Sequence, residues 1–339
     1  MDAFELNLAR PLPWQTETWL RVQRQCEADQ LPHALLLAGP PGVGKRRFAL
    51  ALGAGLLCQN PAEGLACGHC RACALMAAGT HPDWTWLAPE EKGKAIKIDD
   101  VRALVQSMAQ TSQQGGRKLV VLEPAEAMNR NSANALLKTL EEPSGATVLL
   151  LISDNPSRLL PTIRSRCQRL EFPLPSAAAA RAWLEPIAGD HQRMEIALSE
   201  AGQRPLLARQ LLEGDALEKR GELATALAAV LSGKTSVLAV AEQWQEWDWE
   251  DLLDWLQARL AQAVRCRSAD VTPPDAAVSE LVRIESPQLF GLLDRIREIQ
   301  QHSRAGGNPN RQLALESLLI DLCDAVDGNP MVGRLGSLR

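Results

Sequence analysis

The sequence predicts an α/β domain built on a parallel sheet, followed by an all-α region. Up to about residue 172, short apolar runs alternate with stretches of helical spacing, which is typical of a parallel sheet covered on both faces. A glycine-rich loop joins the first apolar run to the first long helical stretch. After "FPLP" (172–175) the runs of strand length cease, and helical patterns separated by Gly or Pro continue to about residue 328.

Five apolar runs are predicted strands, because each is short, rich in Leu, Val, Ile or Trp, and bounded by turn or polar residues. They cover residues 33–39, 83–88, 118–123, 146–153 and 168–172. Helical spacing predicts helices over residues 46–58, 98–110 and 132–142. In the second of these, Asp99 is the expected N-cap.

Length and charge limit the class of protein. The 339 residues suit two or three domains, and 46% hydrophobic with 23% charged residues is typical of a globular protein. The formal net charge of −5 argues against autonomous nucleic-acid binding, although not against work beside DNA in an assembly. The first residues lack a secretory h-region and no apolar run approaches the ~20 residues of a membrane span, so we expect a cytoplasmic protein.

The stretch "GPPGVGKRRF" (39–48) is a candidate phosphate-binding loop. Gly39, Gly44 and Lys45 fit the pattern G-x-x-x-x-G-K-[S/T], and Gly42 lies between them. Such a loop offers backbone N–H groups and a lysine to phosphate oxygens. Where the pattern requires Ser or Thr to bind Mg²⁺, this chain has Arg46, which carries no acceptor atom.

A second departure follows the strand at 118–123, where an Asp-Glu pair is expected. Glu123 keeps a carboxylate on a longer side chain, and Pro124 cannot activate a water molecule. Since the loss of one such group typically costs orders of magnitude in rate, we predict that this chain does not hydrolyse ATP. Nucleotide binding without hydrolysis stays open, because Lys45 and the loop glycines are retained.

Four cysteines form the pattern C-x8-C-x2-C-x2-C: Cys58, Cys67, Cys70 and Cys73. Two overlapping C-x2-C steps and an upstream thiol predict a tetrahedral structural Zn²⁺ site, with no open position for water. An iron–sulfur cluster is the chemical alternative, since it uses the same ligands.

A basic turn, "TIRSRC" (162–167), places Arg164 and Arg166 after the strand at 146–153. The residue types alone favour a solvated turn without a specific function.

Tryptophans gather in "EQWQEWDWEDLLDW" (242–255). On one continuous helix, Trp244, Trp247 and Trp255 would lie opposite the apolar stripe and could contact another chain. The alternative is a helix that begins at an Asp248 cap.

Together these stretches resemble a known family. "LPHALLLAGPPGVGK", "CGHCRAC", "GTHPDW", "NSANALLKTLEEP" and "TIRSRC" are similar to segments of bacterial clamp-loader subunits of the AAA+ class. The degenerate loop, the impaired acidic motif and "NRQLALESLL" near the C-terminus point to a subunit type that does not turn over ATP. The resemblance covers nearly the whole chain and is densest over residues 31–172.

The resemblance implies three domains. These are a RecA-like AAA+ domain (1–172) with an inserted zinc module (58–73), a small helical lid (173–214) and a helical collar (215–339). Five such chains would form a ring through their collars. The implied partners are the gamma/tau ATPase subunits and the delta subunit, with the sliding clamp and primed DNA reached through the assembly, as part of a DNA polymerase holoenzyme.

The resemblance also gives the basic turn a role. The family's Ser-Arg-Cys motif falls on Ser165, Arg166 and Cys167. Arg166 would be an arginine finger that reaches in trans to the γ-phosphate in a neighbouring subunit, a contact worth ~10³–10⁵ in rate in related reactions. The sensor-1 position falls on Ser153, and no sensor-2 residue is assigned because Pro205 stands at the expected arginine.

Three functions therefore compete. The first is a non-hydrolysing, stator-like clamp-loader subunit. The second is an active AAA+ ATPase subunit of a replication or repair complex that tolerates Arg46 and Glu123. The third is a zinc-dependent nucleic-acid-binding module, against which the acidic net charge argues.

Overall fold

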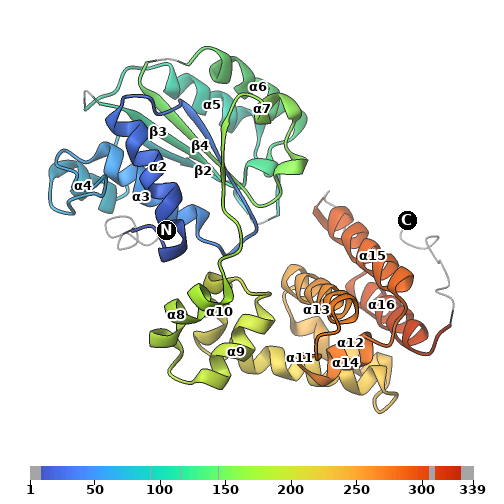
Figure 1. Cartoon of the computed structure of the whole chain (residues 1–339). Coiled ribbons are helices and arrows are strands. Elements are labelled where there is room, and N and C mark those ends of the chain that lie inside the picture. The colour runs from blue at the N-terminus through green and yellow to red at the C-terminus, as the bar shows by residue number, and fades with distance from the viewer. Residues whose placement is uncertain (1–8, 92, 115, 144, 305–309, 330–339) are drawn as a thin grey trace. The chain divides into compact units, whose positions relative to one another are not determined.

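The computed structural model describes residues 9–91, 93–114, 116–143, 145–304 and 310–329. The chain divides into two compact units (Figure 1). The first contains Met1–Pro186 with Arg204–Leu207, and the second contains Ile187–Gln203 with Ala208–Arg339. The predicted domain boundaries at 172/173 and 214/215 stay predictions, and their outermost residues, 1–8 and 330–339, lie outside the described residues.

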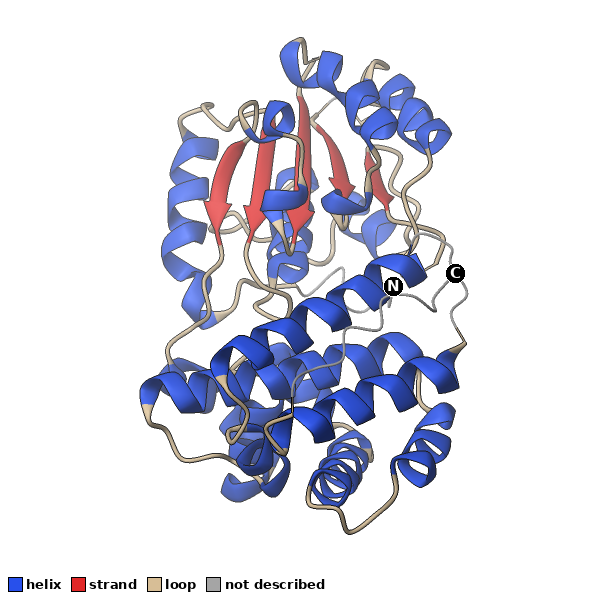
Figure 2. Cartoon of the chain, turned by 90° about the vertical axis from the view of Figure 1, so that its right-hand side faces the viewer, coloured by secondary structure: helices blue, strands red, loops and turns tan. Residues whose placement is uncertain are grey.

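A five-stranded parallel sheet forms the centre of the first unit. Its strands are β1 (Ala34–Ala38), β2 (Trp84–Leu87), β3 (Lys118–Leu122), β4 (Thr147–Ser153) and β5 (Gln168–Glu171). Their order is β2-β3-β4-β1-β5, and every pairing is parallel (Figure 2). All five predicted strands are confirmed, and β1 lies where the strand order reverses, which is where α/β sheets bind ligands.

Helices cover both faces of this sheet (Figure 1). On one face, α2 (Thr16–Glu27) and α3 (Lys45–Leu57) pack on Leu35 and Leu37 of β1. On the other face, α5 (Ile98–Met108) and α6 (Arg130–Glu141) pack on Leu36. Because neighbouring strand residues point to opposite faces, a strand buried on both sides must be apolar throughout, as β1 is.

The shorter elements of the first unit connect this framework. They are η1 (Pro13–Gln15), α4 (Arg71–Ala77), η2 (Ala125–Ala127), η3 (Pro156–Arg158), α7 (Pro161–Arg164) and the first part of α8 (Ala177–Ala188). Within this group, α4 rests on α3 through Met76, which packs against Leu50 and Ala54.

One detail of α5 differs from the prediction. The helix begins at Ile98, and its N-cap is Lys97, whose side chain makes no capping hydrogen bond. Asp99 is not the N-cap: it lies with Asp100 in the first turn, where negative charge favourably meets the positive end of the helix dipole.

The second unit is entirely helical among its described residues. Its helices are the end of α8, α9 (His191–Glu200), α10 (Pro205–Leu212, from Ala208 onward), α11 (Ala216–Leu231), α12 (Val237–Gln243), η4 (Trp244–Glu246), α13 (Trp249–Ala269), α14 (Ala276–Leu281), α15 (Ser286–Arg304) and α16 (Arg311–Val326). From α11 onward these helices share one apolar core. The predicted all-α region is confirmed.

The tryptophan-rich segment folds as the second of its two alternatives. Asp248 caps α13 by accepting a hydrogen bond from the Asp251 backbone, so the helix does not run through from residue 242. Trp244 and Trp255 are only 1% and 2% exposed and pack edge to face inside the core. The prediction that these two rings contact another chain is therefore wrong.

No helix among the described residues has both the length and the apolar character that a membrane crossing requires.

Candidate functional site

The glycine-rich loop leaves the carboxyl end of β1 and leads directly into α3 at Lys45. Gly42 and Gly44 have φ values of 77° and 95°, in the left-handed region that favours glycine. Gly39 is required for a different reason, because a Cβ there would lie 2.0 Å from the Phe172 carbonyl oxygen. The strand–loop–helix context predicted for a phosphate loop is thus present.

Lys45 is held inside this loop by the chain itself. Its Nζ lies 2.6 Å from Asp154 Oδ1 and donates to the carbonyl oxygens of Gly39 and Pro40 at 2.6 and 2.7 Å. The side chain is only 4% exposed. Since a lysine ammonium has three donors, these three acceptors satisfy it, and a phosphate would have to displace at least one of them.

Arg46 and Glu123, the two departures from the active pattern, face each other. Arg46 Nη1 lies 3.4 Å from Glu123 Oε2, and the guanidinium stacks 4.9 Å from the Trp86 ring centroid. Burial raises the pKa of Glu123, while the charge of Arg46 opposes that rise. The carboxylate of Glu123, which a bound metal ion would need as a ligand, is therefore already paired with the guanidinium of Arg46.

Two other segments cover the loop. The backbone N–H of Leu206 donates to Gly42 O at 3.1 Å, and a Cβ on Gly42 would lie 2.6 Å from Leu207 Cγ. From the N-terminal side, Trp14 Nε1 and Gln15 Nε2 both donate to Val43 O, at 3.0 and 3.1 Å. The loop is thus contacted by the chain on both flanks, while Pro41 at its tip is exposed.

The carboxyl end of β4 completes the site. Ser153, the predicted sensor-1 residue, is fully buried, and its Oγ has no hydrogen-bond partner among the described residues. Asp154 follows it, and Glu126 Oε1 accepts from the backbone N–H groups of Asp154 and Asn155 at 2.9 Å each.

Sequence reasoning missed Asp154, Glu126 and Trp86. Asp154 had a usable signal, since it directly follows a predicted strand and the carboxyl ends of parallel strands meet at one edge. Trp86 and Glu126 required the strand order, which the sequence does not give.

The four predicted metal ligands converge. Cys58 caps the end of α3, Cys67 lies in the following loop, and Cys70 and Cys73 lie at the start of α4. All four Sγ atoms lie within 4.8 Å of one another. Backbone N–H groups also point at the sulfurs, from Cys67 to Cys58 Sγ at 3.2 Å and from Cys73 to Cys70 Sγ at 3.5 Å.

The sulfur spacing tests which metal group would fit. Four thiolates at about 2.3 Å from one tetrahedral ion are separated by about 3.8 Å. The measured Sγ–Sγ distances are 3.8 Å (Cys58–Cys70), 3.9 Å (Cys67–Cys73) and 3.7 Å (Cys58–Cys73). A multi-iron cluster between the sulfurs would hold them further apart, so the cysteines fit a single ion such as Zn²⁺.

The basic turn is anchored by its apolar residues. Ile163, in α7, and Cys167 are buried in the core beneath α6. Burial raises the pKa of the Cys167 thiol to about 12, so this cysteine stays a neutral core residue and not a nucleophile or metal ligand. Between these anchors, Ser165 Oγ donates to Thr162 O at 3.2 Å.

Arg166 is one-third exposed on this turn. Its Nη2 lies 2.5 Å from Glu141 Oε1, and its Nη1 donates to Thr162 O at 2.9 Å. Its partners are thus at the end of α6 and within its own turn, and the structure does not join Arg166 to the phosphate loop of the same chain.

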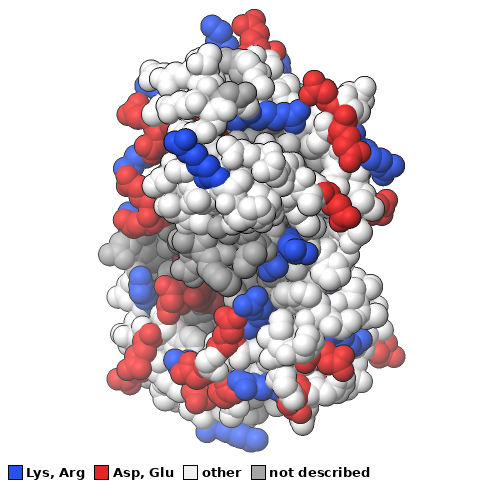
Figure 3. Space-filling view, turned by 90° about the vertical axis from the view of Figure 1, so that its left-hand side faces the viewer, with Lys and Arg blue, Asp and Glu red and all other residues white. Residues whose placement is uncertain are grey.

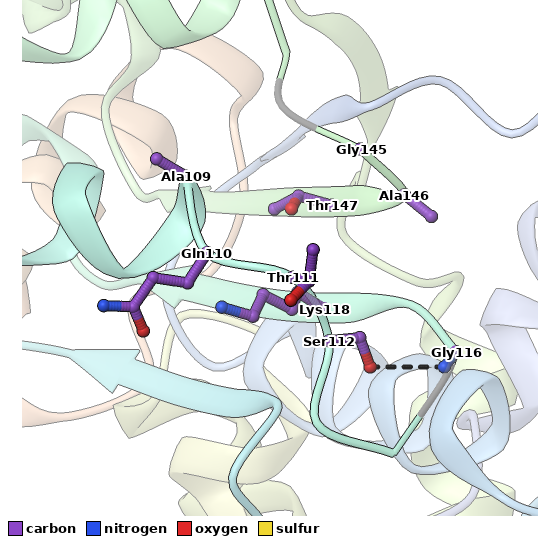
Figure 4. A pocket seen from close by; sticks show the side chains of 9 residues that line it. All are labelled: Ala109, Gln110, Thr111, Ser112, Gly116, Lys118, Gly145, Ala146 and Thr147. Carbon is purple, nitrogen blue, oxygen red and sulfur yellow. Dashed lines mark hydrogen bonds between the residues drawn. The ribbon is translucent and has the colours of Figure 1, made fainter.

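A small cavity of about 190 Å³ lies elsewhere in the sheet domain (Figure 4). It opens at the starts of β3 and β4, near Lys118 and Thr147, which is the opposite edge of the sheet from the phosphate loop. The described residues that line it include no acid, cysteine or histidine. The cavity therefore belongs to neither the loop nor the cysteine cluster.

The surface charge agrees with the composition on the face that Figure 3 presents. Among the described residues on this face, acidic and basic side chains are interspersed, and Lys and Arg form no continuous field.

Comparisons with known proteins identify relatives along nearly the whole chain. The family model described as "DNA polymerase III, delta subunit" matches residues 14–176, and its C-terminal counterpart matches residues 214–324. The DNA polymerase III subunit delta' of Pseudomonas aeruginosa is 49% identical over 319 residues, which cover 91% of this chain and 96% of that protein. The Escherichia coli subunit delta' is 35% identical, with 91% and 94% covered.

Among solved structures, the chain resembles a gamma subunit-related protein of DNA polymerase III from Thermotoga maritima. The TM-score is 0.44 and the identity 20%, with 92% of this chain and 99% of that chain covered. The sequence relatives are far closer than this, and their similarity extends through the sheet domain and the helical region alike. This chain therefore belongs to the DNA polymerase III subunit delta' family.

Proposed function

We propose that the chain is a non-hydrolysing, stator-like subunit of the DNA polymerase III clamp loader. In this role it assembles with the gamma/tau ATPase subunits and the delta subunit, and supports ATP-dependent loading of the sliding clamp onto primed DNA. Membership of the delta' family supports the assembly role. The observation that carries the non-hydrolysing role is the pairing of Arg46 with Glu123.

Around this pair, the site lacks the groups that ATP hydrolysis requires. Mg²⁺ needs oxygen ligands, and Arg46 offers none. Its positive charge also lies next to Glu123, the remaining acid, so a metal ion would meet repulsion and an already paired carboxylate. With Lys45 satisfied by Asp154 and Pro124 unable to activate water, the loop serves as a structural turn.

The basic turn supplies chemistry to another chain. The buried anchors Ile163 and Cys167 fix the backbone on either side of Arg166, while its guanidinium stays accessible. A fixed guanidinium directed at a neighbour's γ-phosphate stabilises the charge that develops in phosphoryl transfer. Arg166 would thus be an arginine finger in trans, with Ser165 and Cys167 as its motif neighbours.

The cysteine cluster has a structural role in this proposal. Cys58, Cys67, Cys70 and Cys73 would hold one Zn²⁺ ion, which ties the end of α3 to the start of α4. Four thiolates saturate the ion, so it takes no part in the reaction.

The test compares Arg166→Ala with Arg164→Ala, a nearby arginine of the same turn, in the reconstituted complex. Arg166→Ala should remove the finger only from the ATPase site next to this chain. In single-turnover hydrolysis, the phase that belongs to this site should therefore be slowed by ~10³ or more, and the other phases should keep their rates. Arg164→Ala should behave as wild type. Full turnover with Arg166→Ala would refute the finger.

The isolated chain tests the competing function. DNA-stimulated ATP turnover that Lys45→Ala abolishes would establish an active ATPase and overturn the stator role. We expect no turnover from the wild-type chain or from Lys45→Ala, because the hydroxyl ligand of the metal and the second acid of the pair are both missing.

A further inference from the structure

The contact between Glu141 and Arg166 has no part in the function proposed above. Glu141 is the last residue of α6, the helix that packs beside α7. Its carboxylate lies 2.5 Å from Arg166 Nη2. Exposed ion pairs of this kind usually contribute little to stability, so a contribution to stability does not explain why these two side chains are paired.

The backbone at both Glu141 and Arg166 is anchored by a buried neighbouring residue. Leu140, which precedes Glu141, is buried, and its carbonyl oxygen lies 2.9 Å from His33 Nε2 at the start of β1. Arg166 is followed by the buried Cys167. The carboxylate and the guanidinium are therefore each presented by backbone that the core holds in place.

The ion pair with Glu141 also leaves N–H donors of the Arg166 guanidinium available to bind an anion. Of its five N–H donors, one is directed at Glu141 and one at the Thr162 carbonyl oxygen. Among the described residues no other acceptor is recorded for this side chain, so three donors remain for an anion. A guanidinium already held at two points loses less conformational freedom when it meets a phosphate oxygen than a free one would.

We propose that Glu141 is a positioning residue for the arginine finger. It holds the Arg166 guanidinium in the orientation from which the finger reaches the neighbouring subunit's γ-phosphate, and the pair persists while the finger acts. This inference rests on the proposed role of Arg166, and extends the trans-acting site from the basic turn to the end of α6.

The experiment uses the full chain in the reconstituted complex and compares Glu141→Ala, Glu141→Gln and Glu142→Ala. Misplacing a catalytic group by about 1 Å can cost up to ~100-fold, and we expect Glu141→Ala to reduce kcat at the adjacent site about tenfold. The KM for ATP should stay within about twofold, because the finger acts on the transition state. Glu141→Gln keeps a carbonyl acceptor and should recover most of the rate, and Glu142→Ala should have no effect.

A double-mutant cycle separates positioning from general structural damage. In the Arg166→Ala background, Glu141→Ala should produce no further loss, because there is no finger left to position. An added loss in that background, or weaker assembly of the complex, would assign Glu141 a structural role and overturn the inference. Faster turnover with Glu141→Ala would also overturn it, since Glu141 would then be a restraint on the finger.

The two proposals can fail separately. If Arg166→Ala itself leaves turnover unchanged, the finger is wrong. If Arg166→Ala removes a phase of hydrolysis and Glu141→Ala does not slow it, the finger stands and only the positioning role is wrong.

Discussion

The guanidinium of Arg46 lies 3.4 Å from the carboxylate of Glu123. In the sequence these residues count as two separate departures from an active ATPase, but in the structure they are partners. Arg46 supplies the positive charge beside an acid that burial disfavours in its charged form. Restoring one residue alone would therefore leave the other without its partner.

Replacing Arg46 with threonine tests this relationship. Arg46→Thr restores the hydroxyl of the active pattern, yet we expect no ATP turnover, because Pro124 still replaces the second acid. The variant should also lose about 1 kcal/mol of stability, from the ion pair and the stacking on Trp86. ATPase assays and thermal unfolding of the isolated chain measure both effects.

The stability loss should depend on pH. Burial raises the folded-state pKa of Glu123, so its charged form costs stability once the pH rises through that pKa, and Arg46 offsets the cost. Arg46→Thr should therefore destabilise more at about pH 8 than at about pH 5. Arg21→Thr removes the same charge from an exposed position of α2, away from Glu123, and its effect should be nearly the same at both values. Equal pH dependence in the two variants would contradict the pairing.

The cysteine cluster predicts a metal content. Purified protein should carry about one zinc ion per chain, and Cys70→Ser should lose it. Cys26→Ser makes the same substitution outside the cluster and should retain the metal. Elemental analysis measures the metal content of each protein. Iron in place of zinc, together with visible absorbance, would show that the four thiolates bind an iron–sulfur cluster and not a single ion.

Most of the first unit's framework could be predicted from the sequence, because strands buried on both faces are continuous apolar runs. The cysteine cluster could also be predicted, since its ligands are close in the chain. The contacts of Lys45 with Asp154, and of Arg166 with Glu141, could not. They join residues 109 and 25 positions apart, and depend on strand order and on how α6 meets α7. Local patterns carry no information about such pairs.

His81 should make the protein sensitive to mild acid. Burial lowers the pKa of His81, and its Nε2 has no hydrogen-bond partner among the described residues. Because the folded-state pKa lies below the unfolded value of about 6.5, the unfolded chain takes up the proton first, and stability falls as the pH drops below about 6.5.

The slope contributed by His81 can reach about 1.4 kcal/mol per pH unit. His81→Gln cannot be protonated and should flatten the decline between about pH 7 and about pH 5.5 in thermal unfolding. His302→Gln, on an exposed position of α15, should leave the decline unchanged. An identical decline in His81→Gln and wild type would rule out His81 as its source.

Arg259 should be a major source of stability in the helical unit. It is 1% exposed and lies 2.8 Å from Glu200 of α9 and 2.6 Å from Asp275, the N-cap of α14, while its guanidinium stacks on Trp255. Burial raises the pKa of Glu200, and Arg259 opposes that rise. Removing the arginine would leave the buried Glu200 carboxylate and the partly exposed Asp275 carboxylate without their shared partner, so Arg259→Ala should cost about 3–5 kcal/mol.

Two variants show that this cost comes from the buried contacts and not from the charge alone. Arg259→Lys keeps the charge but cannot span both carboxylates with a planar fork, so it should recover only part of the loss. Arg297→Ala removes an exposed arginine that pairs with Asp294 at 2.8 Å, and should change stability by less than about 1 kcal/mol. Urea unfolding of the three variants ranks them. If Arg259→Ala were as mild as Arg297→Ala, the contacts of Arg259 would contribute no more to stability than an exposed ion pair, and apolar contacts would be what holds α9, α13 and α14 together.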